Sequence, residues 1–217
     1  MNKNLPRFIT AAVVILVTVA LFFLFKTIAF DIVIGALALV GLFEVIKVSV
    51  KGKKPLWGVL FFVLIAAGFL SLLSFKYIGL VYPATLQFVI LVICIAWIPD
   101  GGAFIVGSLI GKHKMAPKTS PNKTWEGFGG GILAGILVAV VFSLITDGDI
   151  VRNIIICIGL TIAGVLGDLL FSKYKRVLAI KDFGNVFPGH GGVLDRFDSV
   201  LIVAIVLRLI CLVSEKL

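Results

Sequence analysis

The chain has 217 residues, of which 60% are hydrophobic and only 14% are charged. Soluble domains are about half apolar and about a quarter charged, so this composition excludes an ordinary soluble enzyme and indicates a membrane protein. The net charge of +9 suggests nucleic acid only in a soluble protein. In a membrane protein it reflects cytoplasmic loops rich in Lys and Arg, so we expect no nucleic acid partner. The two His and three Cys indicate neither a His-rich metal site nor a disulfide set.

The hydrophobic residues fall in runs of roughly 20 residues, the length that a helix needs to cross a bilayer. The runs that we expect to span the membrane are residues 8–25, 28–46, 56–75, 86–111, 126–146, 151–171 and 195–213. The sequence therefore predicts an all-α polytopic membrane protein with about seven transmembrane helices.

The distribution of Lys and Arg predicts the orientation of these helices. With the N-terminus in the cytoplasm, most of the 20 basic residues lie in cytoplasmic segments, as the positive-inside rule requires. The same orientation places two polar stretches, residues 112–124 and 173–198, on the cytoplasmic side. We therefore expect an intramembrane polar site that is built from both stretches and faces the cytoplasm.

Two acidic residues lie within the apolar runs. Asp100 is well inside one, where an ionisable group costs about 2.5–3.5 kcal/mol on insertion scales. That cost indicates a metal ion, a water-filled cavity or a cationic partner, and the alternative is a structural ion pair. Glu44 lies near the cytoplasmic end of another run, and we favour an ion pair with Lys47, one helical turn away.

The end of the sixth run carries a polar helix face. Asp168, Ser172 and Lys175 are spaced i, i+4, i+7 and share this face, with Arg176 beside them. A carboxylate that holds Mg²⁺, with cations nearer the cytoplasm, would suit a polyphosphate. The alternative is an ordinary cytoplasmic helix end, where the helix dipole and the membrane topology both favour basic residues.

The sequence PGHGG at residues 188–192 cannot form a regular helix, because its glycines favour other backbone conformations. A Gly-rich turn before a helix N-terminus is typical of an anion site. Asp195 and Asp198 follow in the first turns of the next helix, where acids also stabilise the dipole. Asp168 and Asp195, on adjacent helices, could share one divalent metal. His190 either contacts phosphate or shapes the turn.

The stretch before the fifth run is polar as well. Ser120–Pro121 predicts a turn, Thr124 a helix cap, and Glu126 falls in the first helical turn. The remaining polar residues form a cationic lip suited to a triphosphate: Lys118, Ser120, Asn122 and Lys123. Carboxylates for a metal and cations for phosphates together indicate phosphoryl or nucleotidyl transfer at a lipid phosphate.

Three stretches resemble the phosphatidate cytidylyltransferase family. Residues 172–198, SKYKRVLAIKDFGNVFPGHGGVLDRFD, resemble the family signature of Ser, Lys-Arg, Lys-Asp, Pro-x-His-Gly-Gly and Asp-Arg-x-Asp. Residues 120–127, SPNKTWEG, resemble its Ser-Pro-x-Lys-Thr-x-Glu-Gly element. Residues 100–104, DGGAF, resemble its intramembrane Asp-x-Gly-Ala-Tyr element, with Gly101 and Phe104 in place of the usual Thr and Tyr.

The resemblance implies that CTP and phosphatidic acid react to give CDP-diacylglycerol and pyrophosphate, with Mg²⁺ alone or with a second cation. It implies Asp168 and Asp195 as metal ligands. The catalytic residues that it implies are Asp168, Asp195, Lys181, Asp198 and Arg196. The substrate-binding residues that it implies are Ser120, Lys123, Thr124, Ser172, Lys175, Arg176, Asp182, His190, Gly191 and Gly192. Asp100 would support the site.

The sequence has no convincing repeat and no low-complexity segment, so we expect one integral membrane domain, residues 1–217, and place it in the bacterial inner (plasma) membrane. Within it we expect N-terminal helices in 1–85 and catalytic helices with cytoplasmic loops in 86–217. Homodimers are an expectation from the family. Two alternatives are a cytidylyltransferase that acts on an isoprenoid ether lipid and, from another class, an ion-coupled transporter. The polar residues crowd one side of the membrane, which argues against alternating access.

Overall fold

The computed structural model describes residues 19, 20, 22–78, 85–186 and 191–214. Within these ranges, six helices are long and apolar enough to cross a membrane. They are α2 (Ile28–Lys51), α3 (Pro55–Ile78), α4 (Thr85–Ile110), α5 (Trp125–Thr146), α6 (Ile150–Val177) and α7 (Leu194–Ser214). The prediction of an all-α polytopic membrane protein is confirmed. The first predicted span, 8–25, lies mostly outside the described residues and stays a prediction.

Two helices continue beyond the predicted spans. Helix α2 runs past residue 46 to Lys51, and α6 runs past residue 171 to Val177. An apolar run marks only the part of a helix that lies in hydrocarbon, whereas backbone hydrogen bonds continue beyond it. Basic residues in the last turn also stabilise the negative end of the helix dipole. The polar face that begins at Asp168 therefore lies on one uninterrupted helix.

The connection between α4 and α5 is a small antiparallel hairpin, which we did not predict. Its strands are β1 (Lys114–Ala116) and β2 (Ser120–Thr124), with a register irregularity between them. The predicted turn at Ser120–Pro121 is wrong: Ser120 begins β2, and the turn occupies residues 117–119. A short polar strand with a proline gives no periodic signal, and it is tolerated because β2 has a free edge.

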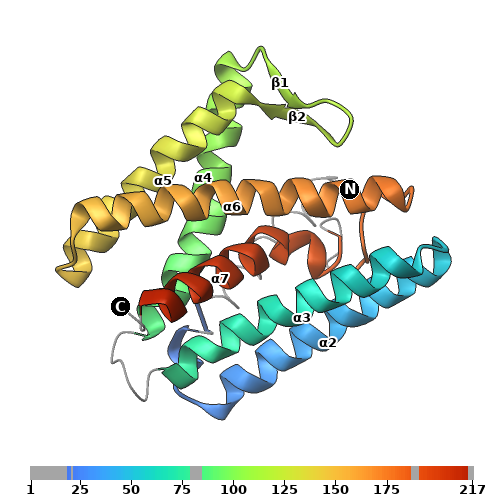
Figure 1. Cartoon of the computed structure of the whole chain (residues 1–217), viewed down its shortest axis with the longest axis horizontal. Coiled ribbons are helices and arrows are strands. Elements are labelled where there is room, and N and C mark those ends of the chain that lie inside the picture. Colours follow the sequence, from blue (N-terminus) through green and yellow to red (C-terminus); the bar gives the residue numbers. More distant parts are fainter. Residues whose placement is uncertain (1–18, 21, 79–84, 187–190, 215–217) are drawn as a thin grey trace, which may run out of the picture.

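The helices form two groups (Figure 1). Helix α2 packs on α3, α3 packs on α7, and α7 packs on α6. Helices α4 and α5 lie along each other and carry the hairpin at their shared end, and α5 packs on the other side of α6. Glycines permit the close approach of α4 and α5. A Cβ added at Gly127 would lie 2.7 Å from the carbonyl oxygen of Ala103 and 3.2 Å from the Cα of Gly107. Small residues therefore hold the two backbones near contact, as in other membrane helix pairs.

An aromatic cluster fixes the C-terminal end of α6. The rings of Phe61 on α3 and Tyr174 on α6 are stacked, with their centroids 3.9 Å apart. The ring of Phe171 meets that of Phe61 edge-on, with a centroid distance of 5.1 Å. Phe183, in the segment after α6, packs against Tyr174 at 5.7 Å. The Tyr174 hydroxyl shares a hydrogen bond with Ser49 of α2. This cluster holds α2, α3, α6 and the following loop in one arrangement.

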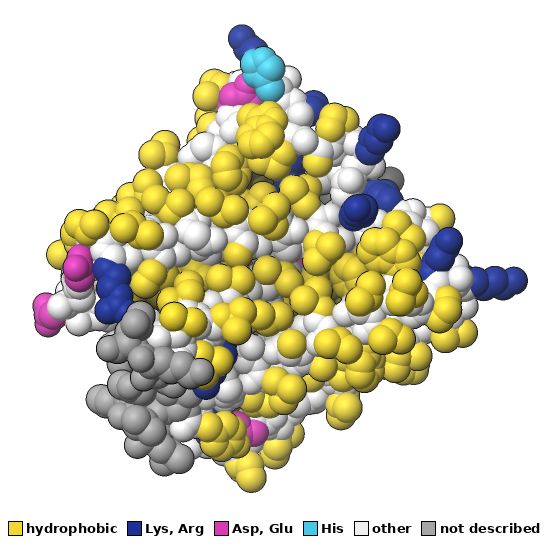
Figure 2. All heavy atoms as spheres, in the orientation of Figure 1, with side chains coloured by type: hydrophobic (Ala, Val, Ile, Leu, Met, Phe, Trp, Pro, Cys, Tyr) yellow, Lys and Arg dark blue, Asp and Glu magenta, His cyan; other side chains and the backbone are white. Residues whose placement is uncertain are grey.

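The helix ends sort into two sets, as a protein that crosses the membrane repeatedly requires. The hairpin lies at the top of Figure 1, the turn between α2 and α3 and the end of α6 lie at its right, and α7 starts at the end that faces them. The opposite ends lie toward the lower left. Figure 2 shows apolar side chains over the helices and most of the visible Lys and Arg side chains on the upper right. The ends that we predicted to be cytoplasmic are thus the basic ones.

Candidate active site

A cavity of about 210 Å³ lies between the hairpin and helices α4, α5 and α6. Asp100 of α4, Lys123 of β2, Phe128 of α5 and Val165 of α6 are among its lining residues. Ser120, Asn122 and Thr124 also line it. Two of the stretches singled out in the sequence, residues 100–104 and 120–127, therefore border one cavity.

Lys123 and Asp168 connect this cavity to α6. The Lys123 Nζ atom lies 2.5 Å from Asp168 Oδ2, and both side chains are largely buried. The Ser172 hydroxyl donates a hydrogen bond of 3.3 Å to Asp168 Oδ1, which confirms the predicted i, i+4 face. Arg176 Nε donates a bond of 3.4 Å to the carbonyl oxygen of Thr119. The two polar stretches, 112–124 and 173–198, thus meet as we predicted.

Asp100 lies within electrostatic range of charged residues of three other elements. The charges of Lys123, Asp168 and Arg196 all act on its carboxylate. A second small hollow, about 10 Å³, is lined by Asp100, Lys123 and Ser199, so it reaches from α4 to α7. Asp100 therefore borders a cavity, and its charge is felt by Lys123 and Arg196, while a metal ion, water or direct ion pair at this acid stays a prediction.

Asp195 is one of the signature acids, and its side chain is only 3% exposed. Its Oδ1 atom lies 2.8 Å from Lys175 Nζ of α6. Its Oδ2 atom accepts hydrogen bonds from the backbone N–H groups of Phe183, at 2.8 Å, and Gly192, at 2.9 Å. One carboxylate thus joins α6, the loop after it and the first turn of α7.

Gly191 is required beside Asp195. Its φ of +89° lies in the left-handed region that favours glycine. An added Cβ would lie 2.7 Å from Asp195 Oδ2. Both the backbone conformation and the space therefore require glycine at this position.

Asp198 lies one turn further along α7, within electrostatic range of the Lys123–Asp168 pair. The charges of Asp168, Lys175 and Lys123 act on it, and its Oδ1 atom accepts a hydrogen bond of 2.7 Å from the Ser199 N–H. Close packing makes this approach feasible, because a Cβ at Gly167 of α6 would lie 2.7 Å from Ile202 of α7. The carboxylates of α4, α6 and α7 are therefore electrostatically coupled around Lys123.

Thr124 and Glu126 have the structural roles that their positions indicated. The buried Thr124 Oγ1 accepts a hydrogen bond of 3.1 Å from the Gly127 N–H, so it caps α5. Glu126 Oε1 lies 2.6 Å from His113 Nδ1, and its carboxylate also accepts bonds from the N–H groups of Lys112 and His113. This contact closes the base of the hairpin. We assigned no role to His113 from the sequence, since its partner is brought near only by the hairpin.

The other predicted site residues are less enclosed. Lys181 and Asp182 are exposed directly after α6, and Arg196 is exposed on the first turn of α7. Gly192 is buried, and His190 lies outside the described residues. Among the residues that the structure places, no three His, Cys, Asp or Glu side chains form a group close enough to hold a metal ion. The assignment of Asp168 and Asp195 as metal ligands therefore stays a prediction.

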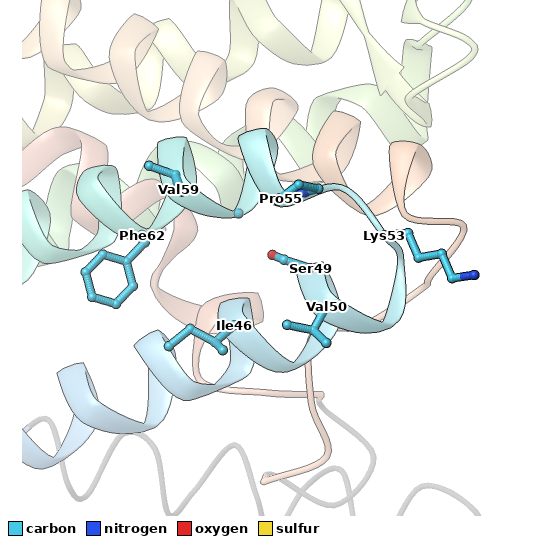
Figure 3. Close-up of a pocket in the computed structure, with 8 residues that line it drawn as sticks. Ile46, Ser49, Val50, Lys53, Pro55, Val59 and Phe62 are labelled. Atoms are coloured by element: carbon cyan, nitrogen blue, oxygen red, sulfur yellow. The ribbon is translucent and has the colours of Figure 1, made fainter.

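A larger cavity, about 420 Å³, lies between α2 and α3 at the end of their hairpin (Figure 3). Its lining is Ile46, Ser49, Val50, Lys53, Pro55, Gly58, Val59 and Phe62. In Figure 3 the Ser49 hydroxyl points into this cavity. That hydroxyl already shares a hydrogen bond with the Tyr174 hydroxyl. None of these lining residues carries a carboxylate, so the cavity offers no ligand of the kind that Mg²⁺ prefers.

Comparison with known proteins identifies one family. The model of the cytidylyltransferase family matches residues 47–214. A phosphatidate cytidylyltransferase of Staphylococcus epidermidis is 46% identical over 127 residues, which cover 58% of this chain and 49% of the relative. Those of Staphylococcus saprophyticus and Bacillus subtilis are 40% identical over 148 residues and 47% identical over 111 residues. These alignments cover 64% and 50% of this chain, and 57% and 41% of the relatives. The chain spans about half the length of the curated relatives it matches.

Proposed function

The chain belongs to the cytidylyltransferase family, and we propose that it transfers CMP from CTP to the phosphate of phosphatidic acid. The products are CDP-diacylglycerol and pyrophosphate. The observation that carries this proposal is the Lys123–Asp168 pair beside the cavity at Asp100, where all three motif stretches converge. The names of the curated relatives support the choice of substrates.

The reaction needs no nucleophile from the protein, because the acceptor is a phosphate anion. A phosphate oxygen of the lipid attacks the α-phosphorus of CTP, the α–β phosphoanhydride bond breaks, and pyrophosphate leaves in line. Lys123, Lys175, Arg176 and Arg196 neutralise the phosphates and the charge that develops on the leaving group. Lys181 is exposed near the start of the loop, where it binds the incoming nucleotide.

The carboxylates fit a divalent cation by their chemistry, because Mg²⁺ prefers carboxylate oxygens together with phosphate oxygens. Asp168 and Asp195 would hold it, with Asp198 and Asp100 adding negative charge nearby. When bound, Mg²⁺ supplies charge neutralisation at the phosphates. Each of the two proposed ligands is paired with a lysine, Lys123 or Lys175. These lysines are then available to bind phosphate oxygens.

The proposed location is the bacterial inner membrane, with the site open to the cytoplasm. Most of the Lys and Arg side chains visible in Figure 2 lie toward the side that carries the hairpin in Figure 1, as expected if that side faces the cytoplasm. CTP is a cytoplasmic substrate, whereas phosphatidic acid enters from the bilayer. A cavity bordered by membrane helices and by the polar hairpin suits both. The homodimer stays an expectation from the family.

A turnover assay tests this proposal. Purified full-length chain in detergent micelles is given radiolabelled CTP, phosphatidic acid and Mg²⁺, with and without a chelator. We expect label in the lipid phase only when both Mg²⁺ and phosphatidic acid are present. Folded protein that labels only an isoprenoid ether lipid phosphate would favour the related acceptor. Folded protein that labels neither lipid would contradict the proposed function and favour the transporter.

A further inference from the structure

Glu44 is a buried acid that the proposed reaction does not use. It lies on α2 and is 4% exposed. Its Oε1 accepts a hydrogen bond of 3.1 Å from the Val193 N–H, and its Oε2 accepts one of 3.0 Å from the Leu194 N–H. These donors are about 150 residues away in the chain. The ion pair with Lys47 that we favoured from the sequence is therefore not what holds this carboxylate.

The space around the Glu44 carboxylate is closed by two glycines of the signature loop. A Cβ added at Gly184 would lie 2.2 Å from Glu44 Oε1, and one added at Gly192 would lie 2.3 Å from the same atom. On the same helix, Gly41 packs against Leu194, where an added Cβ would lie 3.0 Å from Leu194 Cδ2. Gly184 and Gly192 therefore both lie against the Glu44 carboxylate.

Two carboxylates accept hydrogen bonds from three successive backbone N–H groups at the start of α7. Asp195 accepts from the Gly192 N–H, while Glu44 accepts from the next two N–H groups, those of Val193 and Leu194. A helix N-terminus after a Gly-rich turn attracts an anion. At this helix the anion is the side chain of Glu44, so these two N–H groups are not available to a substrate phosphate.

We propose that Glu44 is a positioning residue for the active site. Its carboxylate fixes Gly184, Gly192 and the first turn of α7, and so sets where Asp195 and Asp198 lie relative to Asp168. Without it, the N–H groups of Val193 and Leu194 are buried without acceptors, and the turn must shift to satisfy them. The effect on turnover rests on the proposed function, whereas the effect on the loop does not.

The first test changes Glu44→Gln in the full-length chain and measures backbone amide hydrogen exchange at residues 191–197. Glutamine keeps the size, but its NH₂ group faces one of the two N–H donors. We expect exchange at Val193 and Leu194 to rise about tenfold or more, as for loss of a hydrogen bond to a charged group. The matched control is Asp31→Asn, which removes an acid at the opposite end of α2, where it pairs with Lys76. It leaves exchange at 191–197 unchanged.

Turnover distinguishes positioning from general stabilisation. In Glu44→Gln we expect the kcat to fall about tenfold or more, with the KM for phosphatidic acid within about twofold and the thermal midpoint nearly unchanged. Unchanged exchange at 193 and 194 would overturn the proposal. So would a uniform rise in exchange across α2 and α7 with a lower thermal midpoint. If the unmodified chain shows no transfer, the proposed function fails, and the exchange result alone decides the role of Glu44.

A second pair of variants tests the contact with the loop. Gly184→Ala places a methyl group against Glu44 Oε1 and is expected to raise exchange at 193 and 194. In the Glu44→Ala background the carboxylate that the methyl group would meet is gone. The same change is then expected to raise exchange at 193 and 194 by less than about twofold. Gly184 does not have a positive φ, so alanine adds no backbone strain. Fully additive effects of the two changes would contradict contact between Glu44 and the loop.

Discussion

At the scale of single residues, two lysine–aspartate pairs define the site. Lys123 pairs with Asp168, and Lys175 pairs with Asp195, and all four side chains are largely shielded from solvent. Enclosed ion pairs contribute little net stability, because desolvation offsets much of their attraction, yet loss of one partner is destabilising. Pairs of this kind are consistent with lysines and acids that exchange partners when a substrate binds.

We therefore predict that Lys123→Met lowers turnover about 100-fold or more, since it removes a cation from the proposed phosphate site. It also lowers the free energy of unfolding by about 1–3 kcal/mol, because Asp168 loses its counterion. Adding Asp168→Asn restores most of the stability and none of the turnover. Kinetics and thermal unfolding in detergent measure both quantities. Lys114→Met, a change at an exposed lysine of β1, is the control.

The proposed metal ligands require a separate prediction. Asp168→Asn and Asp195→Asn keep the size of the side chain and remove its charge, so each is expected to lower turnover about 100-fold or more. Excess Mg²⁺ should restore part of the loss if the remaining ligands still bind it. Near-normal turnover in both variants, measured at saturating CTP, would refute the metal assignment.

At the scale of elements, the pairing of α4 with α5 decides where the hairpin lies. Gly127 touches α4, whereas a Cβ at Gly129, two residues along the same helix, meets nothing within 4 Å. Thr124 caps α5 and also packs on Gly107 of α4, where an added Cβ would lie 3.0 Å from its Oγ1. Lys123 thus reaches Asp168 because these contacts between small residues place β2 beside α6.

Gly127→Ala is expected to separate α4 from α5, since the new methyl group meets backbone atoms that cannot rotate away. We predict a loss of about 1–3 kcal/mol of stability, the usual cost of overpacking. Turnover falls in parallel as Lys123 moves. The matched change Gly129→Ala should be neutral or stabilising by about 0.5–1 kcal/mol, because alanine is the better helix former. Equal thermal midpoints for the two variants would contradict this packing argument.

At the scale of the whole molecule, the described helices have their basic ends on one side and form a polar site there. That arrangement predicts which turns face the cytoplasm. Cysteines introduced by Lys118→Cys in the hairpin and Gly148→Cys in the α5–α6 connection should react with an impermeant maleimide from opposite sides. In intact cells only the cysteine at 148 is expected to be labelled, and in inverted vesicles only the one at 118. The reverse pattern would show that the hairpin faces outside and would contradict the predicted orientation.

Local patterns in the sequence were sufficient to predict the spans within the described residues and the helix face that Asp168 and Ser172 share. Hydrophobic length and side-chain periodicity are properties of one helix, so they need no knowledge of its neighbours. The spacing of the motifs likewise identified the polar stretches that meet at the site, and their resemblance identified the family.

Only the tertiary structure decided which side chains pair. Lys123 meets Asp168 because β2 folds back over α6, and Glu44 meets Val193 and Leu194 because α2 packs beside α7. The sequence suggested Lys47 as the partner of Glu44, since a neighbour on the same helix is the simplest choice. A contact between residues about 150 positions apart depends on how helices pack, and a pattern within one helix does not identify the helix that it meets.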